Sequence, residues 1–486
     1  MSYFVKIIFP SGPKIFGEHN YQIDSGNILG RVKEVSTITR AINIDKSFEN
    51  SKALIRFVNT DGYFDEIMKS DDRYILKKQI KIFDDKTLIF SGMVSNLPKC
   101  PPNEFKIEAD VKTAGFDNKV NSVIKKSEFP QVPQENEGKN SNIIGGYVTD
   151  NGGNGTGALV AVRVDENCYL AAWHHVSITE IYDSNETEIT SSCTVYDENG
   201  YTYINYTSNE PELYYNCFGL ESNGQVLSNP ADILAEIVSR FSNFPITNFE
   251  QAQDVYKNRG YSGVAIAITN EMTWREFFRQ FSLNFDCYIF LSVDGKLTVK
   301  ALDWGREAER HVIPKIYVDS NTFENWMDFK GITNEYKRMY WYHYRKSFFH
   351  RMPQDIIQPT GWEAESNNID LRFNKDDLTT RDVTSREACL RKNPIIWYGF
   401  SIGKEIAKDI EIGDVVSFQY SRGYYPNQWR LCLITRITYI QNSTLIRFEG
   451  MDVNGINESA IILQDSQTEN AVKLKDTADS LCNVLL

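Results

Sequence analysis

The sequence predicts a mainly β protein with α+β modules, in which two similar β-barrel domains accompany a small all-β insertion and an α+β domain. Three runs at residues 411–420, 429–439 and 444–449 alternate polar with apolar residues or are β-branched, and turn residues separate them. The same order of runs and turns occurs at residues 79–111. Similar strand order and loop length at two distant positions indicate a duplicated β-module.

Length and charge limit the class of protein. A chain of 486 residues with 41% hydrophobic residues can form three or four packed domains. Its formal net charge of -13 disfavours a protein that gains affinity by neutralising phosphates. The N-terminus lacks a signal-peptide pattern, and no run approaches the ~18 apolar residues of a spanning helix. We therefore expect no membrane segment, and synthesis and assembly in the cytoplasm.

The first barrel is predicted at residues 1–117. Turn residues at 61–62 and 84–85 separate its strands, and residues 64–69 fit one helical turn. Residues 118–227 differ, because polar and Gly-rich connectors alternate there with short strand-like runs. This segment is therefore predicted to be the all-β insertion.

Two adjacent histidines in the insertion, His174 and His175, lie near Glu180 and Asp183 in the sequence. A metal site needs several converging ligands, whereas adjacent residues on a strand point to opposite faces. We expect one imidazole in the core and one in solvent, and we predict no metal site.

The α+β domain is predicted at residues 228–320. Asn229 is a favourable N-cap with proline at the first helical position, and Thr273 with Glu276 forms a capping box before a second helix. A strand at 263–268 lies between the helices, and a hairpin with an Asp-Gly turn follows the second. The second helix also carries a stripe of aromatic residues, which favours a buried face: Phe277, Phe278, Phe281 and Phe285.

The second barrel is predicted at residues 321–458 and a C-terminal tail, helical or extended, at 459–486. Residues 334–345 alternate two faces and are rich in tyrosine, so we assign them to the first strand of this barrel. Interleaved basic and aromatic residues could stack on single-stranded nucleic acid, but packing at a protein interface is the favoured interpretation. A short helix at 385–392 leads into a further strand at 394–402.

No catalytic, cofactor-binding or metal-ligating residue is predicted. The chain lacks a nucleophile elbow, a zinc-protease motif and a phosphate-binding Gly-rich loop after a strand. Eight cysteines are dispersed without a Cys-x-x-Cys pair, which is typical of small core residues in a reducing compartment: Cys100, Cys168, Cys193, Cys217, Cys287, Cys389, Cys432 and Cys482. We therefore predict no enzyme.

Several stretches resemble phage tail hub proteins, the family of baseplate hubs and gene transfer agent hubs. Residues 54–65 are similar to the strand and Asn-x-Asp-Gly-aromatic corner of their first barrel, and residues 89–94 to the strand that follows. Residues 412–416 resemble the entry to their second barrel. The order of helix, strand, capped helix and hairpin over residues 229–300 is the best single match.

The resemblance implies a structural protein of the virion tail, located at the distal hub of a baseplate or tail tip. It implies a homotrimer whose two tube-like barrels per chain form a pseudo-sixfold ring, so that the hub acts as a symmetry adaptor between the sixfold tail tube and a threefold tip or spike. Tail tube, distal tail, tip and spike proteins are then the expected partners. Phage DNA would pass through the lumen without specific binding, which an acidic lumen would favour.

A different class of function is a carbohydrate-binding or receptor-binding tail protein. The insertion between residues 141 and 227 is rich in Tyr and contains a Trp, and aromatic rings stack on sugar faces. An enzyme acting on the cell wall is a third hypothesis, although no segment of the size of a lysozyme or peptidase is left over.

Overall fold

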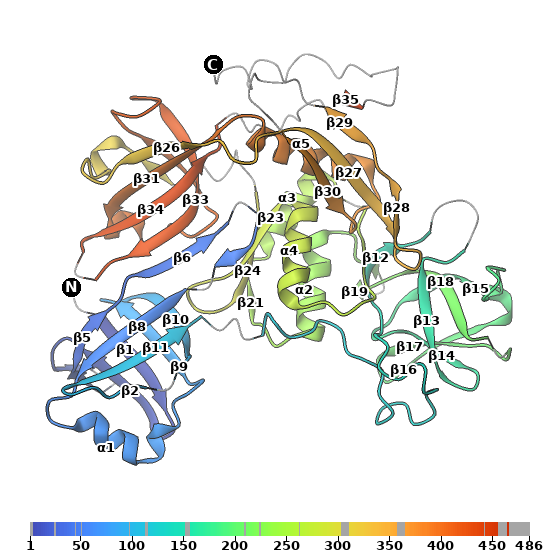
Figure 1. Ribbon diagram of the computed structural model, residues 1–486, viewed down its shortest axis with the longest axis horizontal. Coiled ribbons are helices and arrows are strands. Elements are labelled where there is room, and N and C mark those ends of the chain that lie inside the picture. The colour runs from blue at the N-terminus through green and yellow to red at the C-terminus, as the bar shows by residue number, and fades with distance from the viewer. Residues whose placement is uncertain are drawn as a thin grey trace.

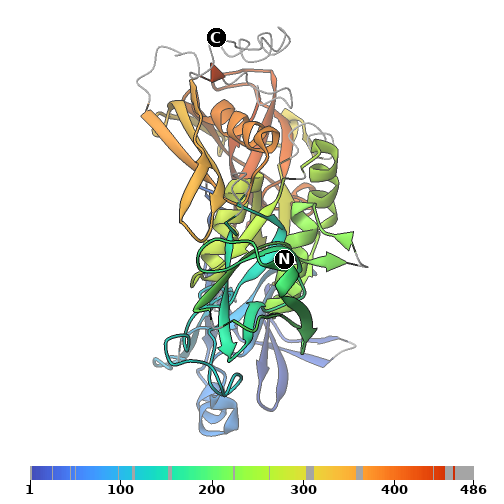
Figure 2. The same ribbon diagram turned by 90° about the vertical axis from the view of Figure 1, so that its right-hand side faces the viewer.

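The protein is described here by a computed structural model, which covers residues 3–23, 26–43, 45–49, 51–96, 98–111, 115–150, 156–208, 210–222, 225–261, 263–302, 311–356, 365–441, 443–454 and 464–465. Two sheets lie one above the other on the left of Figure 1, helices occupy the centre and the insertion lies on the right. The first sheet also lies below the second in the view of Figure 2. The fold is mainly β with α+β modules, as predicted.

The first sheet has nine strands in the order β3-β4-β2-β1-β9-β10-β11-β8-β5. Alternate residues of its long strands are buried, which is the pattern of a sheet with one face on a core. The helix α1 (Tyr63–Lys69), predicted as one helical turn, lies between β8 and β9. The strands are β1 (Tyr3–Phe9), β2 (Gly12–Gly17), β3 (Tyr21–Ile23), β4 (Gly26–Gly30), β5 (Val32–Val35), β8 (Lys52–Val58), β9 (Gln79–Asp84), β10 (Thr87–Val94) and β11 (Glu104–Asp110).

The second sheet has the order β25-β32-β33-β34-β31-β26, and β6 and β7 from the N-terminal part of the chain join it beside β33. The short helix α6 (Lys404–Ala407) follows β31. The strands are β6 (Ile38–Ile42), β7 (Phe48–Glu49), β25 (Val312–Ile313), β26 (Glu324–Asp328), β31 (Ile395–Gly403), β32 (Val415–Gln419), β33 (Trp429–Tyr439) and β34 (Leu445–Asp452).

The two sheets repeat one arrangement. The order β5-β8-β11-β10-β9 in the first sheet corresponds to β26-β31-β34-β33-β32 in the second, and every pair in both series is antiparallel. A helix follows the second strand of each series along the chain, α1 after β8 and α6 after β31. The duplication predicted from the sequence is therefore present, and it extends over five strands and a helix.

Neither sheet closes into the barrel that was predicted, within the described residues. The hydrogen-bonded path of the first sheet ends at β3 and β5, and that of the second at β25 and β26. One edge strand of each sheet leads directly into another sheet, since β5 runs on into β6, and β26 runs on into β27 (Thr333–His343).

The insertion is a sheet in the order β16-β17-β14-β13-β18-β12-β22, with β15 beside β18. The strand β22, which was predicted as part of the α+β domain, pairs with β12 and so belongs to this sheet. The strands are β12 (Ile143–Val148), β13 (Leu159–Asp165), β14 (Cys168–Ala172), β15 (Ser177–Tyr182), β16 (Thr194–Glu198), β17 (Tyr201–Asn205), β18 (Glu212–Phe218) and β22 (Ala265–Ile268), followed after β18 by a small hairpin of β19 (Glu221–Ser222) and β20 (Gln225–Val226).

Three helices form the centre: α2 (Pro230–Phe241), α3 (Glu250–Arg259) and α4 (Trp274–Phe285). The predicted N-cap and capping box are both formed, since the Asn229 side chain accepts from the Ala231 N–H and Thr273 exchanges hydrogen bonds with Glu276. The aromatic stripe of α4 is buried, as predicted. The helices pack with β21 (Ile246–Thr247) and the predicted hairpin, β23 (Cys287–Leu291) and β24 (Leu297–Ala301). Sequence reasoning missed α3.

The tyrosine-rich strand at 334–345 was assigned to the second barrel, and this assignment is wrong. It forms β27 of a separate sheet, because Gly331 turns the chain away from β26 with φ +72° and β30 then pairs along β27. This sheet comprises β27, β28 (Phe348–Arg351), β29 (Gln354–Ile356), β30 (Glu365–Leu371) and β35 (Gln464–Asp465), and α5 (Asp377–Arg391) covers it. The helix predicted at 385–392 is the second half of α5. The tail at 459–486 lies outside the described residues apart from β35.

Candidate functional site: the joint between the repeated sheets

One stretch of backbone connects the two repeated sheets. Strand β5 pairs with β8 in the first sheet, and β6 begins only a few residues later and pairs with β33 in the second. The β6 register places Ile38 opposite Tyr439 and Ala41 opposite Arg436. The second sheet therefore contains strands that the first module supplies, and we call the surrounding contact region the joint.

Side chains from the ends of the strands complete the joint. The Tyr3 hydroxyl donates to the carbonyl of Ile440 at 3.2 Å, and the Lys404 ammonium forms an ion pair with Asp84. Gln441 accepts from the Val35 N–H at 2.8 Å. Burial raises the pKa of the Tyr3 hydroxyl, and the nearby Asp84 carboxylate adds to this effect, so the hydroxyl remains a neutral donor.

Buried charges fix the joint to the central helices. Lys46, in the loop between β6 and β7, pairs with Asp286 at 2.6 Å, and both side chains are less than 5% exposed. Asp286 ends α4 in the left-handed region, with φ 50°. Burial alone would raise the pKa of the Asp286 carboxyl, but Lys46 and Arg386 hold it below its ordinary value. The β6–β7 hairpin is thus held by an ion pair shielded from water.

The joint brings together different ends of the repeated module. The end of β9, at Asp84, contacts the other sheet where β31 ends and α6 begins, at Lys404. In the repeat β9 corresponds to β32, and β31 corresponds to β8. The contact is therefore heterologous, that is, head-to-tail, and each sheet has one end that remains outside it.

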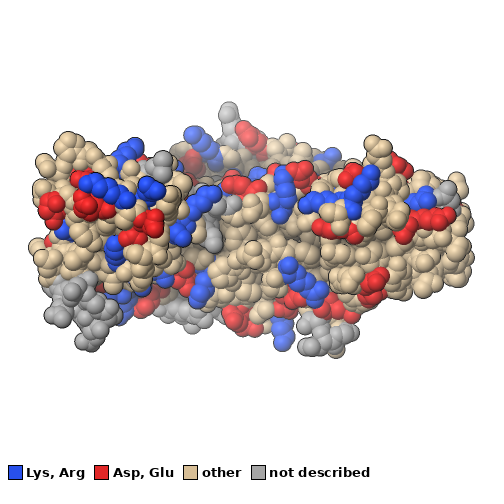
Figure 3. Space-filling view, turned by 90° about the horizontal axis from the view of Figure 1, so that it is seen from below, with Lys and Arg blue, Asp and Glu red and all other residues tan. Residues whose placement is uncertain are grey.

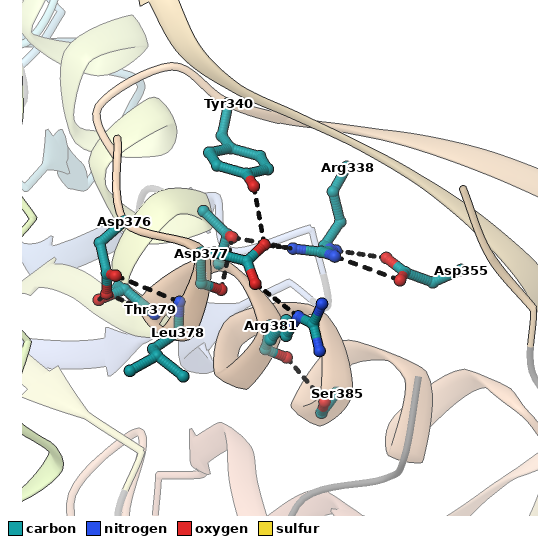
Figure 4. Close-up of polar contacts among 10 residues, drawn as sticks. Arg338, Tyr340, Asp355, Asp376, Asp377, Leu378, Thr379, Arg381 and Ser385 are labelled. Carbon is teal, nitrogen blue, oxygen red and sulfur yellow. Dashed lines mark hydrogen bonds and ion pairs between the residues drawn. The ribbon is translucent and has the colours of Figure 1, made fainter. Parts of the chain in front are cut away.

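A second buried network holds α5 on β27 (Figure 4). Arg338 is fully buried and forms a two-pronged contact with Asp355, while its Nη1 donates to Asp377 at 2.9 Å and to Thr380 at 3.0 Å. The Tyr340 hydroxyl donates to the same Asp377 carboxylate at 2.7 Å. Burial raises the pKa of Tyr340, and its hydrogen bond to Asp377 acts in the same direction.

This network decides between the two interpretations of the tyrosine-rich strand. Tyr336, Tyr340 and Tyr344 are buried, and Arg338 is engaged with carboxylates. These side chains are therefore not available to stack on or neutralise a nucleic acid strand. They pack at an interface within the chain, under α5 and against the insertion. Sequence spacing gave no sign of the partners Asp355 and Asp377.

The two adjacent histidines lie as predicted. His174 is buried, its Nε2 accepts from the Ile144 N–H at 2.9 Å, and burial lowers its pKa to about 4. His175 is half exposed and pairs with Asp197 at 2.5 Å. No group of three potential metal ligands occurs among the described residues. The cysteines were predicted as core residues, and Cys217, Cys287 and Cys432 are fully buried, but Cys100 is exposed, and Cys482 lies outside the described residues.

The aromatic residues of the insertion pack on one another. The rings of Trp173 and Tyr201 meet edge to face at 4.7 Å, and those of Tyr196 and Tyr203 stack at 5.3 Å. A cavity of about 360 Å³ lies between the insertion and the β27–β28 hairpin, and polar side chains such as Asn140, Asn142, Glu212 and Arg345 line part of it.

Charges of both signs are interspersed on the surface seen in Figure 3. Ion pairs occur on the exposed face of both repeated sheets, for example Arg56 with Glu34 in the first and Arg447 with Glu449 in the second. No described helix has the length and apolar character needed to cross a membrane.

The comparisons with known proteins returned structural likeness only. No protein-family model and no curated protein sequence matches the chain. A prophage tail protein of 43 kDa from Shewanella oneidensis shares 10% identity over 93% of this chain and 98% of its own, with a TM-score of 0.46. A prophage tail protein from Listeria monocytogenes shares 8% identity over 92% of this chain and 94% of its own, with a TM-score of 0.43. A chain of a native gene transfer agent virion shares 11% identity over 68% of this chain and 88% of its own, with a TM-score of 0.45.

Proposed function

We propose that the protein is the structural hub at the distal end of a phage tail or a tail-like particle. One observation carries the proposal: a single chain contains two sheets of the same strand order, joined head-to-tail through β6. A protein that repeats a unit with a heterologous contact can continue the contact from chain to chain and close into a ring. The sequence resemblance to tail hubs supports this role.

The two repeated sheets suit a change of symmetry. Three chains in a ring would present six similar sheets to a sixfold tail tube, while the insertion, the central helices and the β27 sheet would occur three times. The same ring can therefore meet a threefold tip or spike on its other side. The partners proposed are tail tube, distal tail, tip and spike proteins, and the location is the virion tail.

The ring would enclose the path of the DNA. On the exposed sheet faces some cations are paired with carboxylates, as Arg56 with Glu34 and Arg447 with Glu449, and the formal net charge of the chain is -13. Such a surface neutralises few phosphates, so the DNA passes without specific binding. The proposed role is structural rather than catalytic.

The number of copies tests the proposal. Native mass spectrometry of the assembled ring should give three copies, and electron microscopy of particles with a labelled chain should place the label at the distal end of the tail. Six or twelve copies per ring would contradict the symmetry argument, because two sheets per chain would then give twelve or more sheets.

Carbohydrate or receptor binding is the second candidate, and the cavity beside the insertion is the observation that favours it. The amide of Asn140 and the carboxylate of Glu212 line it, and such groups bind sugar hydroxyls. Glycan-array binding by the full chain that Asn140→Ala abolishes would support this candidate. Absence of glycan binding, together with co-purification of the chain with tail tube components, would favour the hub.

A further inference from the structure

The sheet of the insertion ends in a strand that pairs on one side only. Among the described residues, β16 pairs with β17 and with no other strand. The opposite end of the sheet is closed by the chain itself, because the Ala265 N–H of β22 donates to the Phe373 carbonyl at 2.9 Å. The free edge of β16 presents unpaired N–H and C=O groups to a partner strand. We propose that residues 471–475, in the tail of a second copy of this chain, add to β16 as a further strand.

One face of β16 continues the main core of the insertion. Val195 lies opposite Ile204 of β17, which is fully buried in that core, whereas Val195 itself is 41% exposed. Directly opposed residues of paired strands point to the same face. A partner strand with apolar side chains on this face would therefore extend the core and cover Val195. Asp197 shares the face and already has partners, since it pairs with His175 at 2.5 Å and accepts from the Thr202 hydroxyl at 2.5 Å.

The other face of β16 is acidic. Glu198 is exposed there, two residues from Tyr196, and it forms no ion pair within the part of the chain that the structure describes. Burial raises the pKa of the Cys168 thiol, and the carboxylates of Asp165 and Glu198 add to this effect, so both lie near Cys168. Arg163 donates to the backbone carbonyl of Asp165 at 3.2 Å. A partner strand with cations on this face would supply the counter-charge that Glu198 lacks.

The charge of the whole insertion favours a basic partner. Residues 118–227 contain 15 of the 65 acidic residues of the chain but only 5 of the 52 basic ones, so they account for ten of its thirteen net negative charges. Two paired copies of β16 would bring four carboxylates, those of Asp197 and Glu198, into one short ladder. Like charges destabilise a strand pair, so β16 opposes pairing with itself. Three of the five basic residues, Lys119, Lys126 and Lys139, form ion pairs with other residues.

The tail of the chain contains a run with the matching pattern. In residues 471–475, Ala-Val-Lys-Leu-Lys, the apolar Val472 and Leu474 alternate with Lys473 and Lys475. Alternate residues of a strand point to opposite faces, so this run would have one apolar and one basic face. The apolar face fits over Val195, and the basic face lies beside Glu198. Residues 471–475 themselves lie outside the described residues.

A second copy supplies the run, because the tail of the same chain begins far from β16. Strand β35 places Asp465 opposite Asp355 of β29, and from that level β27 runs about seven residues, or roughly 23 Å, before its hairpin contacts the insertion. Strand β16 lies three strands beyond β13, at about 4.8 Å per strand. Figure 1 shows these steps in succession, with β35 at the top of the view and β16 near the bottom. The chain from residue 465 to residue 472 extends to about 25 Å at most, which is too short.

A peptide of residues 468–478 tests the contact on the full-length chain. Carrying a fluorescent label, the peptide should bind the wild type, and Glu198→Lys should weaken the binding about tenfold, because an attraction becomes a repulsion. Glu405→Lys makes the same change of charge at an exposed position of α6 and should leave the affinity unchanged. A peptide with Lys473→Glu and Lys475→Glu should bind Glu198→Lys more tightly than the wild type, which would also show that this variant is folded.

Methylation of the peptide backbone tests whether the contact is a strand ladder. Successive N–H groups of a strand point to opposite sides, so only one alternate set faces β16. One peptide is methylated at the backbone nitrogens of residues 472 and 474, and a second at those of residues 473 and 475. One of the two should lose binding and the other should keep it. If both bind, or if neither does, the tail does not add to β16 as a strand.

The remaining outcomes concern the occupant, and none of them depends on the proposed ring. Absence of peptide binding, or an equal loss of affinity in Glu198→Lys and Glu405→Lys, would overturn the contact and leave the proposed hub untouched. A full-length chain with Lys473→Glu and Lys475→Glu, when dilute, should bind the wild-type peptide as tightly as the wild type does, because a single chain leaves its own β16 open. Tighter binding by this variant would show that the tail covers β16 of its own chain, and the assignment to a second copy would be wrong.

Discussion

At the scale of single residues, the buried pair of Lys46 and Asp286 makes the N-terminal hairpin depend on the end of α4. Both side chains are almost fully buried, and Arg386 adds a second cation near the same carboxylate. Removal of one partner of a buried ion pair leaves the other charge desolvated and uncompensated. The position of the hairpin is therefore coupled to a charge about 240 residues away in the sequence.

Asp286→Asn should lower the free energy of unfolding by about 3–5 kcal/mol, because the Lys46 ammonium loses its counter-charge without access to water. Urea-induced unfolding followed by fluorescence measures this loss. The matched control is Glu236→Gln, which removes an exposed partner of Arg240 on α2 and should cost less than about 1 kcal/mol. Equal losses of unfolding free energy in the two variants would show that burial does not set the contribution of the Lys46–Asp286 pair to stability.

The lowered pKa of the buried His174 imidazole predicts that the protein loses stability in mild acid. Burial lowers its pKa to about 4, whereas the ordinary value is 6.5, so between these values the unfolded chain binds a proton that the folded protein does not. Stability from this group is complete above pH 6.5 and declines as the pH falls toward 4, by about 3 kcal/mol. His174→Gln, whose amide oxygen can still accept from Ile144, should show a smaller decline between pH 7 and pH 4.5. Parallel pH profiles for the variant and the wild type would contradict this assignment.

At the scale of elements, local sequence signals were sufficient where local chemistry decides the structure. The cap at Asn229, the capping box at Thr273 and the Asp-Gly turn of the β23–β24 hairpin all form, because each depends on residues within a few positions of one another. One buried and one exposed histidine were also predicted, but His174 and His175 lie in the connection between β14 and β15, so the period of a strand is not the cause.

Pairing partners that are distant in the sequence were not predictable in this way. The alternation of β27 indicates a strand, but the pattern does not distinguish the second sheet from the sheet that β27 forms with β30. The same holds for β22, which pairs with β12, and for β6, which crosses to β33. The joint was missed for this reason, although the repeat that it connects was visible in the order of strands and turns.

At the scale of the whole molecule, the exchange of β6 makes the two repeated sheets one structural unit. Ile42 packs in the core of the second sheet, while Ile38 packs in the core of the first. A unit that shares a strand and a buried ion pair should unfold in one step, even though each sheet has a core of its own. The relative position of the sheets, on which a ring depends, is thus fixed by the same residues that stabilise them.

Replacement of residues 38–49 by a Gly/Ser linker of equal length tests this coupling. The variant should show two separated transitions in scanning calorimetry, because the second sheet loses β6 and β7 and the Lys46 pair is removed with them. It should also have a larger radius of gyration in solution scattering, since a Gly/Ser linker is flexible. The control replaces residues 183–187, a turn of the insertion between β15 and β16, and should leave the number of transitions unchanged. A single transition with an unchanged radius in the linker variant would mean that Tyr3, Asp84 and Lys404 hold the sheets together without the exchanged strand, and the orientation of the sheets would then depend on contacts at the strand ends alone.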